Sequence, residues 1–160
     1  MKRIPLTDGK FARVSDCDYA VLHHHRWGYM HTRKGGQYAR RTVRDKQGNQ
    51  RLMHDVVAHR MGLQGPQVDH RNGDTLNNCR SNLRAATNSQ NHANEGLRKN
   101  NKSGFKGVSW SKHAGKWMAG IKVNYKRIYL GYFTQKVKAA KAYNQAARKH
   151  FGKYARLNKV

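Results

Sequence analysis

Residues 67–94 (QVDHRNGDTLNNCRSNLRAATNSQNHAN) contain side chains that can take part in hydrolysis. An acid and a histidine stand next to each other at Asp69 and His70. A carboxylate supplies the hard oxygen that Mg²⁺ prefers, and an imidazole that titrates near neutrality can take a proton from water. Each polar residue of this segment, taken singly, is more often a turn or cap residue. Together and in this order, these residues indicate a hydrolytic site.

The same residues predict the elements that must position such a site. Residues 68–70 resemble a short strand, and Asn72-Gly73 readily forms a tight turn because both residues tolerate positive φ. Thr87 is a good N-cap for a helix that runs to about Asn94. We therefore expect a strand, a return rich in turns, and a helix.

This ordered pattern closely resembles the HNH nuclease family, also called ββα-metal nucleases. The matching positions are Asp69-His70, Asn72-Gly73-Asp74, Asn78, Asn82-Leu83-Arg84, Ser89-Gln90-Asn91 and Asn94. The resemblance implies two antiparallel strands and a helix that hold one divalent ion, Mg²⁺ or alternatively Mn²⁺. His70 would activate water, Asp69 and Asn91 would bind the metal, and the products would carry 5′-phosphate and 3′-hydroxyl ends.

Two positions in the pattern needed a choice between roles. His92 follows Asn91, and one residue turns a side chain by about 100° around a helix, so only one of the two can face the ion. The family register favours Asn91. Asn82 corresponds to the middle asparagine of the motif, so we expect it to fix the loop by hydrogen bonds to the backbone rather than to bind the metal.

Residues 104–160 predict a second module on the basis of their apolar alternation. The expected elements are strands at 105–110, 116–123 and 126–133. They are followed by a helix that Thr134 caps and that runs to about residue 149. One face of this sheet would pack on the helix. We expect the other face to carry Lys106, Lys122, Arg127 and Tyr129.

This second pattern looks like an AP2 domain. The matching positions are Lys106-Gly107-Val108, Lys116-Trp117, Tyr129-Leu130-Gly131-Tyr132-Phe133, Ala139-Ala140, Ala142-Tyr143, Ala146-Ala147 and Leu157-Asn158. In that family the sheet enters the major groove of DNA, which implies contacts from Lys106, Trp110, Lys122, Arg127 and Tyr129. Lysine cannot bind guanine bidentately, so we expect Lys106 and Lys122 to contact phosphate rather than to specify bases.

Basic and acidic residues are unevenly distributed along the chain. The 160 residues include 33 Lys and Arg against 8 Asp and Glu, a net charge of +25. Residues 1–95 hold 16 bases and all 8 acids (16 − 8 = +8), whereas residues 96–160 hold 17 bases and no acid (+17). We therefore expect an HNH domain at 1–95, a basic linker at 96–103, and an AP2-like domain at 104–160. The linker is either an arm that follows the phosphates or a solvated connection.

The N-terminal half indicates a small β-rich segment. We expect strands near 10–14, 37–44 and 50–53, a turn at 46–49, and a helix at 54–61 that Gly62 ends. Consecutive histidines at 23–25 point in different directions, so a surface run is favoured over a metal site. Trp27 and Tyr29 are expected in the core. His54 and His59 could contact phosphate, but surface or packing roles are favoured, so neither is assigned to catalysis.

These observations predict an α+β protein: a β-rich N-terminal segment, an HNH core, and a small three-stranded antiparallel sheet with one helix. Two cysteines exclude a disulfide framework and a four-cysteine zinc site, and no apolar stretch could span a membrane. The order of modules resembles phage-type HNH homing endonucleases, which implies metal-dependent cleavage of double-stranded DNA. The alternatives are a non-catalytic AP2-like DNA-binding regulator with a vestigial HNH fold, and a basic RNA-binding or ribosome-associated protein.

The same resemblance sets expectations for partners and location. Double-stranded DNA is the expected partner, no protein or membrane partner is implied, and the protein would act as a monomer or as a dimer induced by DNA. The N-terminal residues have a basic start but no apolar segment, so we expect a protein of the (host) cytoplasm that is not secreted.

Overall fold

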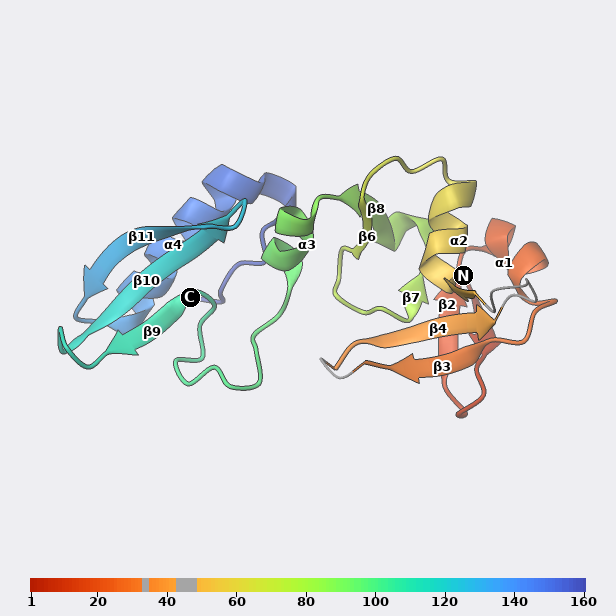
Figure 1. The fold of residues 1–160 in the computed structure, drawn as a ribbon, viewed down its shortest axis with the longest axis horizontal. Coiled ribbons are helices and arrows are strands. Elements are labelled where there is room, and N and C mark those ends of the chain that lie inside the picture. The colour runs from red at the N-terminus through yellow and green to blue at the C-terminus, as the bar shows by residue number, and fades with distance from the viewer. Residues whose placement is uncertain (33–34, 43–48) are drawn as a thin grey trace. The chain divides into compact units, whose positions relative to one another are not determined.

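The computed structural model describes residues 1–32, 35–42 and 49–160 (Figure 1). Its elements are a mixture of helices and small sheets, as the expected α+β class requires. The chain forms two compact units, Met1–Ala86 and Thr87–Val160. The expected turn at 46–49 lies almost entirely outside the described residues.

The described part of the first unit contains three small sheets. Its strands are β1 (Lys2–Pro5), β2 (Phe11–Val14), β3 (Gly28–His31), β4 (Gln37–Thr42), β5 (Gln50–Leu52), β6 (Gln67–His70), β7 (Asn77–Asn78) and β8 (Leu83–Ala86). Its helices are α1 (Asp16–Leu22), α2 (Met53–Arg60) and the short 3-10 helix η1 (Arg80–Asn82). Strands β1 and β2 are antiparallel and β7 joins β2 in parallel, while β3, β4 and β5 form an antiparallel meander. The parallel pairing of β7 brings the return segment of the expected site into the interior of this unit.

The core of the first unit is built around Trp27, which is almost completely buried and whose Nε1 donates a hydrogen bond to the Leu22 carbonyl at 2.9 Å. Tyr29 packs against the same cluster. The prediction that these two aromatic residues belong to the core is therefore confirmed. The three histidines at 23–25 are exposed after α1, which agrees with the surface run that we favoured.

A buried acid joins three elements of this unit. The carboxylate of Asp18, on α1, is fully buried and accepts hydrogen bonds from Arg60 of α2 at 2.8 Å and from Arg80 of η1 at 2.7 and 2.8 Å. The Arg80 backbone also donates to the Ser15 hydroxyl at 2.9 Å. Because η1 leads directly into β8, this network fixes the strand that pairs with β6.

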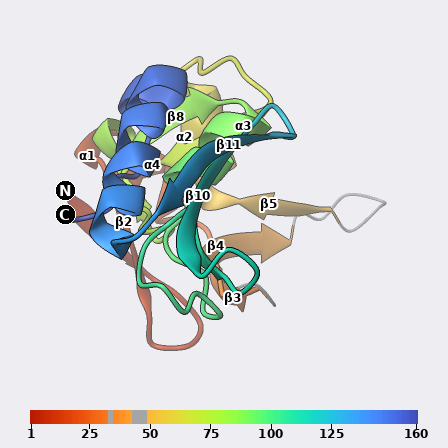
Figure 2. The same cartoon turned by 90° about the vertical axis from the view of Figure 1, so that its left-hand side faces the viewer.

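The second unit contains one antiparallel sheet covered by a long helix (Figure 2). Its elements are α3 (Asn88–Asn94), β9 (Val108–Ser111), β10 (Lys116–Val123), β11 (Lys126–Phe133), α4 (Lys136–Phe151) and the short 3-10 helix η2 (Gly152–Tyr154). Strands β10 and β11 have the predicted bounds. Asn124 and Tyr125 have positive φ (46° and 66°), as a two-residue hairpin turn requires. The predicted cap differs, because Gln135 and not Thr134 is the N-cap of α4.

The boundary between the units falls after Ala86, earlier than the basic segment at which we expected it. The reason is the packing of α3. Ala93 of this helix joins a buried cluster with Ile121 of β10 and with Tyr143 and Phe151 of α4. Helix α3 belongs to the HNH pattern in sequence, but it shares its core with the C-terminal sheet.

Candidate active site

The first predicted site residue, Asp69, lies in a buried ion pair. Strand β6 pairs with β8 in an antiparallel register that sets Asp69 opposite Arg84. The Arg84 Nε and Nη2 atoms lie 2.7 and 2.6 Å from Asp69 Oδ2, and the two side chains are only 7% and 4% exposed. A charge-assisted pair of this kind fixes the direction of the carboxylate.

His70 occupies the next position of β6 and is also buried. Its Nε2 lies 3.0 Å from the Oδ1 atom of Asn78, a residue of β7. An amide oxygen only accepts, so Nε2 carries the proton in this arrangement and Nδ1 carries the lone pair. Burial lowers the pKa of His70, and the hydrogen bond to Asn78 and the charge of Asp69 partly oppose that shift. A neutral imidazole with a defined tautomer is the form in which histidine acts as a base.

A second histidine packs against the first. His54 of α2 is 8% exposed, and its ring meets the His70 ring edge to face, with centroids 5.1 Å apart. The centroid of the Tyr38 ring lies 5.4 Å from the centroid of the His54 ring. Burial, together with the charge of His70, lowers the pKa of His54 to about 3. His54 is therefore a neutral wall of the His70 pocket at ordinary pH.

The loop between β6 and β7 is held by asparagine and aspartate side chains. Asn82 Oδ1 accepts from the Asn72 backbone at 3.1 Å, and its Nδ2 donates to the Asn77 carbonyl at 2.7 Å. Asp74 accepts from the backbone of Leu76 at 3.0 Å and pairs with Arg13 of β2. Asn82 thus has the loop-fixing contacts that its place in the pattern predicts.

Asn91, the predicted helix ligand, belongs to the second unit. It lies on α3, whose first turn is fixed by a capping box: Thr87 Oγ1 accepts from the Gln90 backbone at 3.2 Å, and Gln90 Oε1 accepts from the Thr87 backbone at 2.8 Å. The neighbouring His92 is exposed, and its Nδ1 lies 2.7 Å from Glu95 Oε1. The structure therefore groups Asp69, His70 and Asn82 in one unit and places Asn91 in the other.

The donor set of these residues suits a hard divalent cation. Asp69 offers a carboxylate oxygen held in place by Arg84, a type of ligand that Mg²⁺ accepts. The described residues contain no cluster of three or more His, Cys, Asp or Glu side chains that would hold an ion such as zinc. Cys79 is buried and unpaired, as expected of a packing residue.

Three of the five predicted DNA contacts share one face of the C-terminal sheet. Lys122 of β10 pairs with Arg127 of β11, and Gly120 pairs with Tyr129. Cross-strand partners point to the same side of a sheet, and Ile121, the neighbour of Lys122, is buried on the other side with α4. Lys122, Arg127 and Tyr129 are exposed. They form the free face that the sequence predicts.

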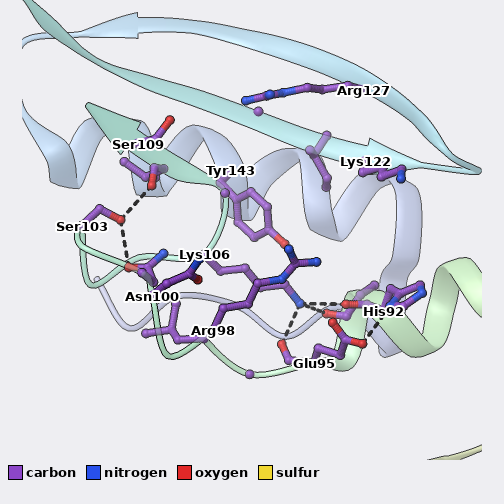
Figure 3. Close-up of a pocket in the computed structure, with 18 of the residues that line it drawn as sticks. His92, Glu95, Arg98, Asn100, Ser103, Lys106, Ser109, Lys122, Arg127 and Tyr143 are labelled. Carbon is purple, nitrogen blue, oxygen red and sulfur yellow. Dashed lines mark hydrogen bonds and ion pairs between the residues drawn. The ribbon is translucent and has the colours of Figure 1, made fainter. Parts of the chain in front are cut away.

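Lys106 corrects the prediction for that face. Its ammonium donates to the carbonyls of His92, Ala93 and Glu95 at 3.1, 2.6 and 2.7 Å (Figure 3). These carbonyls stand at the C-terminal end of α3, where a cation compensates the helix dipole. The three ammonium hydrogens are thereby used, so Lys106 fastens α3 and does not lie on the free sheet face.

Trp110 is likewise not on the free sheet face but on the opposite side of the sheet. It pairs with Trp117, which packs against the core under α4, and the two indole rings meet edge to face at 5.1 Å. Half of its surface is still exposed (51%). Side chains alternate along β9, so Trp110 points away from the face that carries Lys122, whereas Ser109 and Ser111 point toward it.

Sequence reasoning overlooked three residues around His70. Asn78 and Arg84 matched the pattern without an assigned role, and His54 was set aside as a surface or packing residue. The register of β6 against β8 could have indicated Arg84, since it stands directly opposite Asp69. The contacts of His54 and Asn78 depend on α2 and β7, whose positions the local pattern does not give.

Comparison with known proteins agrees with this site. Residues 62–93 match the model of the HNH endonuclease family, so this part of the chain is an HNH endonuclease domain, the domain of a phosphodiester hydrolase. The chain is also 40% identical over 57 residues to protein 3.8 of Escherichia phage T7. That match covers 36% of this chain and 47% of protein 3.8, so the chain spans about half the length of this relative. No solved structure matches the chain. In the part of the chain that the structure describes, no helix is long and apolar enough to cross a membrane.

Proposed function

We propose that this protein is a metal-dependent endonuclease that nicks or cuts duplex DNA, in the manner of homing endonucleases. The observation that carries the proposal is the arrangement on β6: a buried neutral His70, oriented by Asn78, next to an Asp69 that is paired with Arg84, within the HNH domain. The neutral imidazole is the proton acceptor that phosphodiester hydrolysis needs, and it lies beside an anionic oxygen that can bind a cation.

The roles of the residues follow from their chemistry. His70 takes the proton from the attacking water, while Asn78 and His54 hold its ring. Asp69 and Asn91 would hold Mg²⁺ or Mn²⁺, which supplies positive charge to the phosphate and to the leaving oxygen. Arg84 keeps the Asp69 carboxylate in place. The products would carry 5′-phosphate and 3′-hydroxyl ends.

The second unit is proposed to hold the DNA in the manner of an AP2 domain. The free sheet face presents Lys122, Arg127 and Tyr129, two cations and an aromatic ring without an acid among them. Such a face suits the negatively charged DNA backbone and can reach base edges in a groove. Target sequence, and the choice between a nick and a double-strand break, would then depend on how this unit and the HNH domain meet the substrate.

Plasmid cleavage tests the proposal. Purified wild type, His70→Ala and the control His59→Ala are incubated with supercoiled plasmids that carry candidate host or phage targets, in EDTA, Mg²⁺ or Mn²⁺. His59 is exposed on the same helix as His54 and should be dispensable. We expect nicking by wild type and His59→Ala that requires metal, and a loss of at least about 100-fold in His70→Ala.

A parallel binding measurement separates the nuclease from a DNA-binding regulator. Binding of labelled duplex in EDTA should be unchanged in His70→Ala. Wild-type protein that binds duplex tightly but never nicks in either metal would contradict the nuclease and favour a non-catalytic regulator.

A further inference from the structure

The second unit contains a groove of about 1090 Å³ with a strongly basic lining (Figure 3). Its walls are the basic segment 96–103, the C-terminal end of α3, and the edge of the sheet near β9 and β10. Arg98, Lys106, Lys122 and Arg127 line it. Every residue of the lining belongs to Thr87–Val160, so the groove is complete within one compact unit.

Acidic side chains do not compensate this charge. Residues 87–160 contain 17 Lys and Arg and one acid, Glu95. Glu95 is paired with His92, and among the described residues no salt bridge reaches a Lys or Arg of this unit. The cations of the groove therefore have no acidic partner within this unit among the described residues.

Two arginines stand near the part of the groove that Gly96 lines: Arg98 belongs to the lining, and Arg156 lies against Gly96. A β-carbon placed on Gly96 would lie 3.8 Å from Cζ and Nη1 of Arg156, so that guanidinium lies over the start of the basic segment. Burial, and then repulsion from Arg156 and Arg98, lowers the pKa of Lys106 to about 8, although Glu95 opposes the shift. Cations that repel one another at a surface are stabilised when an anion binds between them.

Lys106 cannot be the group that takes this anion, because its three hydrogens are donated to the carbonyls at the end of α3. Its contact with the Glu95 carbonyl fixes the residue that directly precedes the basic segment. Arg98 and Arg156 are exposed, and among the described residues neither guanidinium takes part in a hydrogen bond or an ion pair. Arg98 in the lining and Arg156 against Gly96 therefore carry free donors.

We infer that Arg98 and Arg156 form a binding site for backbone phosphates of duplex DNA, with the basic segment 96–103 as its wall. The inference rests on the proposed function and extends it beyond the sheet. DNA is the occupant because the groove continues to Lys122 and Arg127, which also belong to the free sheet face. A strand that lies on that face can continue along a row of cations to Arg98. The basic segment is then an arm that follows the phosphates and not only a connection.

The salt dependence of binding tests the site. Anisotropy of a fluorescent 20-base-pair duplex is measured in EDTA over a series of KCl concentrations, so that cleavage does not interfere. Each phosphate contact adds about 0.9 to the slope of log Kd against log salt concentration. The double variant Arg98→Gln/Arg156→Gln should therefore lower the slope by about 2 and weaken binding.

Two control variants make the result specific. Lys138→Gln/Lys141→Gln removes the same charge from exposed positions of α4 outside the groove and should lower the slope by less than about 0.5. Arg98→Lys/Arg156→Lys keeps both charges and should keep the wild-type slope. A slope that falls equally in the groove and α4 variants, or that falls as much with Lys as with Gln, overturns the inference.

The outcome is independent of the nuclease test. Wild-type protein that binds duplex but does not nick it would remove the proposed catalysis and leave this site standing, if the slopes behave as expected. Wild-type protein that shows no salt-dependent binding of duplex would overturn both.

Discussion

His54 connects the chemistry of the active site to the stability of the first unit. The ring lies between Tyr38 and His70 and is 8% exposed. The Asp55 carboxylate lies 3.4 Å from its Nε2 and would favour a charged ring, but burial is the larger effect. Burial and the charge of His70 bring the pKa from 6.5 to about 3. Unfolding therefore allows His54 to take up a proton that the folded protein excludes.

The size of the effect follows from these two pKa values. Between about pH 3 and pH 6.5 the unfolded chain binds more protons at His54 than the folded chain, so the free energy of unfolding decreases as the pH decreases. For one such group, acidification from about pH 7 to about pH 5 removes roughly 2 kcal/mol. Below the folded pKa the loss reaches its limit, because both states are then protonated.

Urea unfolding at the two pH values measures this contribution. Trp27 is the one tryptophan of residues 1–86 and is buried in their core, so its fluorescence follows this unit once Trp110 and Trp117 are replaced by phenylalanine. In that background, His54→Phe keeps an aromatic ring against His70 but cannot titrate. Between pH 7 and pH 5, the free energy of unfolding of the parent, which keeps His54, should fall by about 2 kcal/mol more than that of the His54→Phe variant.

The control is His59→Phe, which removes an exposed histidine from the same helix and should behave as the parent. If the parent and His54→Phe lose equal stability over this pH range, His54 is not excluded from protonation in the folded protein. The description of His54 as a neutral wall of the His70 pocket would then be wrong.

Two further predictions concern stability. Asp18→Asn leaves two guanidinium groups without their carboxylate and should lower the free energy of unfolding by about 3 kcal/mol in the same urea assay. This value is at the lower end for a buried ion pair because both arginines are partly exposed. Asp16→Asn, at an exposed position, is the control, and equal effects of the two variants would contradict the network. Gly107→Ala would bring a β-carbon within 2.1 Å of the Tyr143 ring at a φ of 74°, so thermal unfolding of the second unit should show a loss of at least about 3 kcal/mol. Gly104→Ala has a similar φ of 78° but open space, and should cost only about 1–2 kcal/mol; equal losses at the two glycines would show that backbone strain and not the ring contact is responsible.

Local patterns predicted the elements that depend on neighbours in sequence. The alternation at 116–123 and 126–133 predicted two strands with their observed bounds, and Thr87 as an N-cap predicted the start of α3. Caps, turns and alternation depend on interactions within a few residues. The same reasoning failed at Lys106, since the sheet pattern says nothing about the carbonyls of a helix that precedes it in the chain.

The pairing of chemical groups was decided by tertiary structure. The sequence by itself determined that Asp69 and His70 are adjacent, that an HNH pattern surrounds them, and that the C-terminal half is acid-poor and basic. Only the fold brought His54 and Asn78 to the His70 ring and divided the chain after Ala86. The physical reason is that burial and the packing of α3 depend on residues far apart in sequence, and these contacts set the tautomer, the pKa and the unit to which each side chain belongs.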